Sequence, residues 1–344
     1  MENRIESKWI EVFGRVFDLC KVAVGDEVLI LSESQSRRVN VHLAELALLR
    51  LGANVAHLVL PTPELVTNVP IRSTGASNVL SGRSSIVTAL AQSVLVVDMT
   101  QEGLLHAPEL GKILESGTRV LMISDEHPEA LERLVPDEEL RGKVAESVQK
   151  ARGAEIMTVT SGFGTDLKVG LKGCPIAGVW GWTDRPGTIA HWPGGVVVAF
   201  PLRNSVNGRL VLGAGDINLT FKRYLESPVT LVIENDYVVS VEGSGVDAGL
   251  MRRYYEAWND REAYGVSHVG WGLNDKARYE ALMMYDKDDT NGTELRVLAG
   301  NFLFSTGANE HADRFTLGHF DLPMLGCTIK LDNSTVVEDG KLIG

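Results

Sequence analysis

The chain has 344 residues, of which 44% are hydrophobic and 23% are charged, and its formal net charge is −12. This composition is ordinary for a globular protein, and the length is sufficient for two domains. The acidic balance, without a cluster of Lys and Arg, argues against a nucleic-acid partner and against an anionic membrane surface.

The cysteines and the N-terminal segment indicate a compartment. Cys20, Cys174 and Cys327 are odd in number, far apart and without CxxC spacing, so they predict neither a disulfide framework nor a zinc-thiolate site. The N-terminal segment alternates charged and apolar residues, unlike a signal peptide, and no apolar run reaches about 18 residues. We therefore expect a cytoplasmic protein that does not contact a membrane.

The first half of the chain has the pattern of an α/β domain. Apolar residues recur at three- and four-residue steps from Ile5 to Cys20, which predicts an amphipathic helix. Runs of Val, Ile and Leu then alternate with helical stretches, as in buried parallel strands joined by helical crossovers. No glycine-rich phosphate-binding sequence follows these strands, so no nucleotide cofactor is expected. Strands are predicted at 25–31, 53–60, 93–99 and 118–124, and helices at 36–52, at 84–92 and in a segment ending near 116.

The pattern changes after a charged helical stretch over 135–155. From Ile156 onward glycine is denser and short alternating strands replace the earlier rhythm. Asn235-Asp236 between two such strands predicts a hairpin, and a helix is expected over 246–260. The stretch 178–195 is rich in Trp, Gly and Pro, which predicts a loop. We therefore predict an α/β domain with an open, mostly parallel sheet over 1–155, and a β-rich, mainly antiparallel (α+β) domain over 156–344.

A candidate metal site lies near the C-terminus. His319 and Asp321 are two residues apart, so in an extended strand their side chains point to one face. His268 is the best candidate for a third ligand. Two histidines and one carboxylate are the ligand set of mononuclear non-haem Fe(II) centres, which keep positions open for dioxygen and substrate. The same set also suits catalytic zinc, and a histidine near an aspartate is often only a hydrogen-bonded core pair.

Three longer segments narrow these alternatives. YGVSHVGWGLN, GNFLFSTG and GHFDLPM, in this order and spacing, resemble the 2,5-dihydroxypyridine 5,6-dioxygenases, ring-cleaving enzymes of bacterial nicotinate degradation. That family is related in fold to the leucyl aminopeptidase T metallopeptidases. The resemblance is densest from Gly178 to Asp332. It implies an aminopeptidase T-like fold, a homo-oligomer, and a catalytic domain over 156–344 with Fe(II) held by His268, His319 and Asp321.

The resemblance also implies a reaction and its residues. The C5–C6 bond of 2,5-dihydroxypyridine, or of a closely related hydroxylated N-heterocycle, is cleaved with both atoms of O2 incorporated, which gives an N-formylmaleamate-type product. His191 matches the family's acid/base histidine and His106 its pocket histidine, and a histidine that titrates near neutrality suits proton transfer. The residues expected to contact the small aromatic substrate are Trp180, Trp192, Trp271 and Ser305.

One departure from the family pattern concerns specificity. The family carries an acidic side chain in the stretch that matches Gly178, Val179 and Trp180, and this chain has no carboxylate there. A pocket without that polar group discriminates differently among hydroxylated rings. The resemblance therefore leaves the exact substrate open.

Two other functions stay open. A two-metal aminopeptidase needs bridging carboxylates and a further histidine, whereas the matching stretches, 192–195 and 301–304, contain none. A non-catalytic protein that binds a small molecule with the same fold is the other alternative. Metal content separates the three functions: one iron indicates the dioxygenase, two metal ions the peptidase, and none the binding protein.

Overall fold

The computed structural model describes residues 4–64, 77–123 and 125–343, and one part of it is built on a parallel sheet. The strand order is β2-β1-β3-β4-β8, and each neighbouring pair is parallel. The strands are β1 (Glu27–Glu33), β2 (Asn54–Leu60), β3 (Leu95–Asp98), β4 (Arg119–Met122) and β8 (Ile189–His191).

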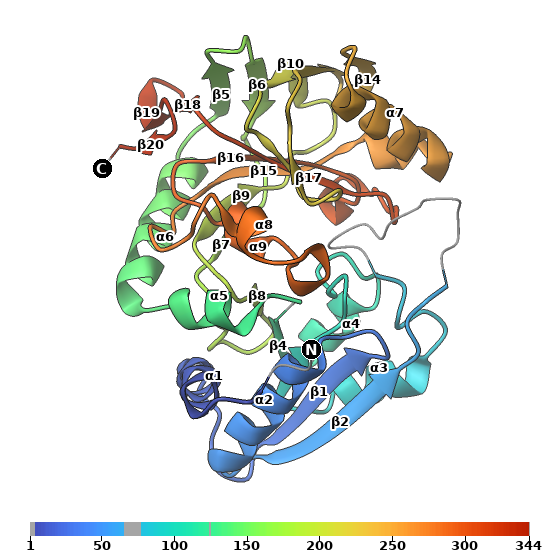
Figure 1. Cartoon of the computed structure of the whole chain (residues 1–344), viewed down its shortest axis with the longest axis vertical. Helices are drawn as coiled ribbons and strands as arrows, with labels where there is room; N and C mark the ends of the chain where they lie inside the picture. The colour runs from blue at the N-terminus through green and yellow to red at the C-terminus, as the bar shows by residue number, and fades with distance from the viewer. Residues whose placement is uncertain (1–3, 65–76, 124, 344) are drawn as a thin grey trace.

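Helices cover both faces of this sheet (Figure 1). Helices α1 and α2 share a core with Ile30, and helices α3 and α4 share a second core with Leu31. Because consecutive side chains of a strand point to opposite faces, burial of both faces explains the unbroken apolar runs in the sequence. The helices of this part are α1 (Ser7–Leu19), α2 (Arg38–Arg50), α3 (Ser84–Leu90), α4 (Leu110–Glu115) and α5 (Pro128–Arg133). The next helix, α6 (Glu138–Arg152), packs instead into the core of the antiparallel part of the molecule.

Antiparallel sheets form the other part of the molecule. An eight-stranded sheet has the order β14-β13-β10-β6-β5-β18-β19-β20, and a five-stranded sheet has the order β17-β16-β15-β9-β7. Val159 and Leu231 of the larger sheet share one core with Val269 and Phe304 of the smaller sheet, so the two sheets pack face to face. Helix α7 adds Met251 to the same core.

The strands of the larger sheet are β5 (Ile156–Ser161), β6 (Asp166–Gly170), β10 (Val206–Leu212), β13 (Val229–Glu234), β14 (Tyr237–Glu242), β18 (Cys327–Leu331), β19 (Ser334–Glu338) and β20 (Lys341–Leu342). The strands of the smaller sheet are β7 (Ile176–Val179), β9 (Val196–Ala199), β15 (Val266–Gly272), β16 (Phe302–Thr306) and β17 (Phe320–Met324). A two-stranded sheet joins β11 (Ile217–Asn218) and β12 (Arg223–Tyr224), and the helices are α7 (Val246–Trp258), α8 (Ala281–Met284) and α9 (Thr293–Arg296).

The predicted fold class is confirmed, since a parallel α/β part is followed by a mainly antiparallel part. The predicted hairpin is also present: Asn235 and Asp236 have φ values of 48° and 74° between β13 and β14. The loop predicted over 178–195 is wrong in part, because 189–191 form β8 beside β4. Local composition does not reveal that a three-residue segment completes a distant sheet.

The last strand of the parallel sheet comes from beyond the predicted domain boundary. Strand β8 belongs to the second half of the chain, yet its residue His191 is paired with Met122 of β4. The division at residues 155 and 156 stays a prediction. Within the described ranges, no helix combines the length and apolar character needed to cross a membrane.

Candidate active site

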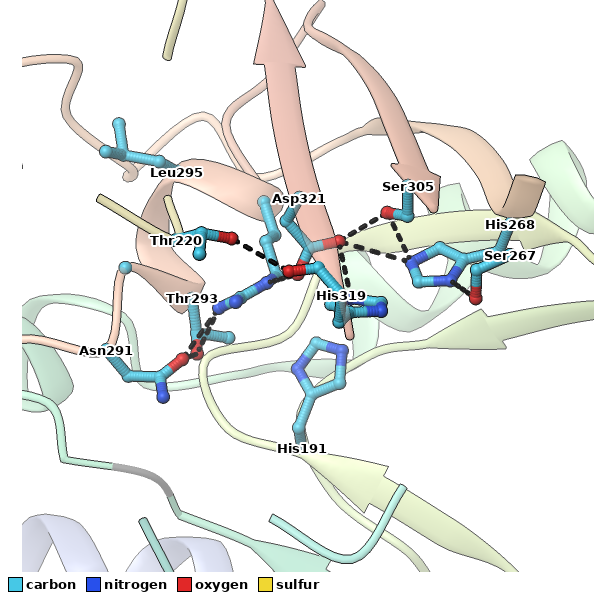
Figure 2. Close-up of polar contacts among 12 residues, drawn as sticks. His191, Thr220, Ser267, His268, Asn291, Thr293, Leu295, Ser305, His319 and Asp321 are labelled. Atoms are coloured by element: carbon cyan, nitrogen blue, oxygen red, sulfur yellow. Dashed lines mark hydrogen bonds and ion pairs between the residues drawn. The ribbon is translucent and has the colours of Figure 1, made fainter. Parts of the chain in front are cut away.

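Three neighbouring strands bring a histidine, a serine and an aspartate side by side (Figure 2). His268 lies in β15, and Ser305 of β16 is paired in register with Asp321 of β17. The Ser305 hydroxyl donates to Asp321 Oδ1 and lies 3.0 Å from His268 Nε2. His319 immediately precedes β17, and its Nε2 is 3.2 Å from the same Oδ1, while His268 Nε2 is 3.7 Å from it. Both imidazoles therefore converge on one carboxylate oxygen.

An arginine holds the other oxygen of that carboxylate. Arg296, the last residue of α9, donates from Nε to Asp321 Oδ2 at 2.6 Å. Burial by itself would raise the pKa of Asp321, but the charges of Arg296 and His319 outweigh it and hold that pKa well below its ordinary value. Asp321 is therefore an ionised, buried carboxylate, which is the form that a metal ion needs.

Two further histidines approach from the parallel sheet. His106 follows β3 and His191 ends β8, where the carboxyl ends of parallel strands form the usual ligand-binding edge of an open α/β sheet. The centroid of the His106 ring lies 5.3 Å from that of His319 and 5.9 Å from that of His268. Its Nε2 is buried and has no hydrogen-bond partner among the described residues. A ligand in this space could supply the missing partner.

His191 is held in one tautomer by the backbone. Its Nδ1 lies 2.6 Å from the carbonyl oxygen of Pro193, and because a carbonyl only accepts, Nδ1 carries the hydrogen. Nε2 is left as the proton acceptor. Burial lowers the pKa of His191 to about 4, although the bond to Pro193 acts in the opposite direction. This value is lower than the near-neutral titration expected from the sequence, so the imidazole is neutral at pH 7.

One cavity of about 260 Å³ between the two parts of the molecule is lined by all four of these side chains, His106, His191, His268 and His319. Asp321 and Arg296 lie on the same wall as His268 and His319. The rest of the lining is largely apolar, and the segment from β7 contributes Ala177, Gly178 and Val179 without a polar side chain, as the sequence indicated. A cavity with one polar wall and apolar surroundings suits a small planar ring.

Comparisons with known proteins identify the family to which the chain belongs. The family model described as NicX, 2,5-dihydroxypyridine 5,6-dioxygenase, matches residues 8–344. The chain belongs to this dioxygenase family. A 2,5-dihydroxypyridine 5,6-dioxygenase from Pseudomonas putida is 36% identical over 338 residues, which cover 97% of this chain and 95% of the relative.

Solved structures extend the likeness to the fold. The structure of 2,5-dihydroxypyridine dioxygenase from Pseudomonas putida KT2440 is similar with a TM-score of 0.92 and 34% identity, and covers 99% of each chain. Wild-type AmpT from Thermus thermophilus is similar with a TM-score of 0.64 and 14% identity over 98% of this chain and 99% of its own, which shows a shared fold alone. Both predicted resemblances are confirmed. As a dioxygenase, this family member has O2 and an organic substrate as its partners.

Membership of a dioxygenase family suggests a metal cofactor, and the donor set can be tested against one. Among the described residues, no three His, Cys, Asp or Glu side chains already surround a common point as metal ligands do. However, the two imidazole nitrogens lie 3.2 Å and 3.7 Å from Asp321 Oδ1. Ligands at about 2.1 Å from one ion and at right angles are about 3 Å apart. The chemistry and spacing of these donors therefore fit a divalent metal, after small side-chain adjustments.

The tryptophans expected at the substrate lie elsewhere. Trp180, Trp192 and Trp271 are absent from the described lining of the cavity. Trp271 belongs to the core between the antiparallel sheets, and Trp192 packs with α1 and donates to the carbonyl of Leu134. Trp180 stacks with the Arg141 side chain. Large aromatic residues near a site are more often buried against its scaffold than exposed to its ligand, and here the structure packs them so.

Sequence patterns missed other residues of the cavity wall. Asn291, Thr293 and Arg296 line the cavity around α9, a helix of four residues that is too short to produce a periodic pattern. The Asn291-Gly292 pair before α9 was the available sequence signal, because it indicates a turn. His311 is exposed at the surface but also lies at the cavity, where its ring centroid is 5.3 Å from that of Phe200.

Proposed function

We propose that the protein is a mononuclear, non-haem Fe(II) dioxygenase that cleaves 2,5-dihydroxypyridine or a closely related hydroxylated N-heterocycle to an N-formylmaleamate-type product. The observation that carries this proposal is the convergence of His268 and His319 on one oxygen of Asp321 inside a ring-sized cavity. The 36% identity to a named 2,5-dihydroxypyridine 5,6-dioxygenase supports the substrate class. The apolar segment from β7 is the reason for including related rings.

In this proposal His268, His319 and Asp321 hold the metal, and one face of the site stays open towards the cavity. Bound Fe(II) supplies one-electron chemistry that allows O2 to react with the ring. Both oxygen atoms enter the product when the C5–C6 bond breaks, so the balance needs no external reductant. The other residues bind the ring and handle its protons.

His191 has the geometry of a general base. Its Nδ1 hydrogen is committed to the Pro193 carbonyl, so Nε2 can take the proton of a ring hydroxyl. His106 closes the same side of the cavity, and its unpaired Nε2 can hydrogen-bond to a polar group of the substrate. Ser305 is buried between His268 and Asp321, outside the described lining of the cavity, and its hydroxyl would reach a substrate oxygen only after a metal takes over the imidazole and carboxylate.

The test is oxygen uptake by protein loaded anaerobically with one equivalent of Fe(II). On addition of 2,5-dihydroxypyridine, we expect one O2 consumed per ring, parallel loss of the ring's ultraviolet band, and a product that gains both atoms of ¹⁸O2 by mass spectrometry. Iron-loaded, folded protein that consumes no O2 with this ring or with related hydroxypyridines would contradict the proposal.

The same preparation tests the two alternatives. Two bound zinc or cobalt ions with peptide cleavage would indicate an aminopeptidase, and ring binding without metal would indicate a binding protein. A fold shared with AmpT at 14% identity does not favour peptide cleavage.

We also propose that the protein forms a homo-oligomer, and the exposed edge of the parallel sheet at β2 supports this proposal. In the described part of that sheet β2 has a partner strand on one side only, and Leu49 and Val59 are 52% and 57% exposed beside it. Light scattering after size-exclusion chromatography tests this, and a monomer at micromolar concentration would contradict it.

A further inference from the structure

The two oxygens of the Asp321 carboxylate have different partners, because Arg296 bonds to only one of them. Oδ2 accepts from Arg296 Nε at 2.6 Å. Oδ1 accepts from Ser305 and lies 3.2 Å from His319 Nε2. The Arg296 and Asp321 side chains are only 11% and 4% exposed, so water does not compete strongly for this bond. A carboxylate fixed in this way presents one oxygen, and always the same one, to the two histidines.

The guanidinium is itself fixed on its other side. Arg296 Nη1 donates to Asn291 Oδ1 at 2.7 Å and to Thr293 Oγ1 at 3.3 Å. Both acceptors, which are labelled in Figure 2, lie at the start of α9, and Arg296 is the last residue of that helix. Because the planar fork of an arginine donates in fixed directions, these bonds set the direction in which Nε points.

The position of α9 is set from the parallel-sheet part of the molecule. Glu126, which follows β4, accepts from the Thr293 backbone N–H and, at 3.0 Å, from the Thr290 hydroxyl. Arg133, at the end of α5, donates to both carboxylate oxygens of Glu294 at 2.6 Å and 2.8 Å. Glu126 and Glu294 are each 1% exposed. Two buried polar contacts therefore join α9 to the sheet that also supplies His106 and His191.

We propose that Arg296 is a positioning residue, which holds Asp321 as a ligand through a single oxygen, and that Glu126 and Arg133 set its place from the parallel-sheet part of the molecule. The inference rests on the proposed function in one respect, namely that Asp321 binds the metal. As a consequence, α9 aligns the metal wall of the cavity, which carries His268, His319 and Asp321, with the wall that carries His106 and His191.

Removal of the Arg296 guanidinium should change the metal affinity in opposite directions for a positioning role and for a purely electrostatic role. A guanidinium close to the site repels a cation, so its removal would tighten metal binding if charge were its whole contribution. A positioning role predicts the reverse, because an unfixed carboxylate can turn away or bind through both oxygens. Loss of such supporting contacts typically weakens metal binding by about 10- to 100-fold.

The experiment is an anaerobic titration of metal-free protein with Co(II) and with Fe(II), without ring substrate or O2. Arg296→Gln is expected to raise the Kd for metal about 10- to 100-fold and to change the visible absorption of the Co(II) form, which reports ligand number. Arg296→Lys keeps the charge without the fork and should also bind more weakly than the wild type. Glu126→Gln should show a smaller change in the same direction.

Arg223→Lys is the matched control, since Arg223 is also paired with a buried aspartate, Asp247, at 3.1 Å, outside the described lining of the cavity. It should leave both the Kd and the spectrum unchanged. Equal or tighter metal binding by folded Arg296→Gln would overturn the inference, and a higher KM for the ring in a separate steady-state assay of that variant would then make Arg296 a substrate contact. Failure of the wild type to bind metal would overturn it too. Tight metal binding without O2 uptake would overturn only the proposed function.

Discussion

The two walls of the cavity use histidine in different ways. On the antiparallel wall, His268 and His319 face the ionised Asp321, whose negative charge is held by Arg296. On the parallel wall, His191 is bonded to a backbone carbonyl, and His106 Nε2 has no hydrogen-bond partner among the described residues. The first wall concentrates charge and is suited to a cation. The second keeps neutral imidazoles, which are suited to accept a proton.

Asp321→Asn should produce the largest effect, because it removes the charge on which the antiparallel wall depends. We expect loss of stoichiometric Fe(II) binding and of O2 uptake. Arg296 would also be left buried without its partner, which destabilises a protein by about 3–5 kcal/mol. Metal analysis and urea unfolding measure the two effects separately.

Asp339→Asn is the control for this change, because Asp339 is an exposed aspartate in a turn of the same part of the molecule. It should keep both properties. Full iron content in folded Asp321→Asn would show that the carboxylate is not a ligand, and the comparison of the two walls would fail.

His191→Asn tests the parallel wall. The asparagine amide can still donate to the Pro193 carbonyl, but it offers no basic nitrogen. We expect kcat to fall by about 10²- to 10⁴-fold, the usual contribution of a general base, with unchanged iron content. His42→Asn, at an exposed histidine of α2, is the control. Loss of iron together with activity would mean that His191 belongs functionally to the metal wall.

Ser305→Ala should have a smaller effect. It removes the hydroxyl that contacts both His268 and Asp321. Loss of one hydrogen bond, worth about 1 kcal/mol, should raise KM for the ring roughly fivefold and change kcat little. Steady-state kinetics at saturating O2 measure this. A fall in kcat with unchanged KM would instead place the hydroxyl in the chemical step.

Asp216→Asn tests a buried carboxylate that, unlike Asp321, has no arginine beside it. We expect this substitution to change the stability of the protein but not its catalytic activity. Among the residues that the structure describes, the Asp216 carboxylate accepts only from the backbone N–H groups of Gly213 and Leu325, each at 2.7 Å, and burial raises its pKa to about 6. Since the folded state then holds its proton more tightly than the unfolded state, its stabilising contribution is present below about pH 4 and is lost as the pH rises through 6.

The free energy of unfolding of metal-free wild type, minus that of Asp216→Asn, should therefore fall between pH 4 and 6, by on the order of 2–3 kcal/mol, and then level off. Urea unfolding at several pH values measures it. A difference that rises over the same interval would mean that Asp216 has an unrecognised cationic partner.

The local features of the fold could be predicted from the sequence. Runs of Val, Ile and Leu predicted strands buried on both faces, and Asn235-Asp236 predicted a hairpin. The spacing of His319 and Asp321 brought their side chains together, because that contact depends only on the two-residue repeat of an extended chain. The longer segments around them identified the family.

Which distant residues share the cavity depends on the packing of the folded chain and could not be predicted from the sequence. Periodicity shows that Trp192 and Trp271 are buried but not whether they face a ligand or a core, and both lie in cores. The role of Arg296 depends on a four-residue helix held by Glu126, which follows β4 in the other part of the molecule, and no local pattern encodes such a contact. His106 and His191 meet the metal wall only because β3 and β8 end at the same edge of the parallel sheet.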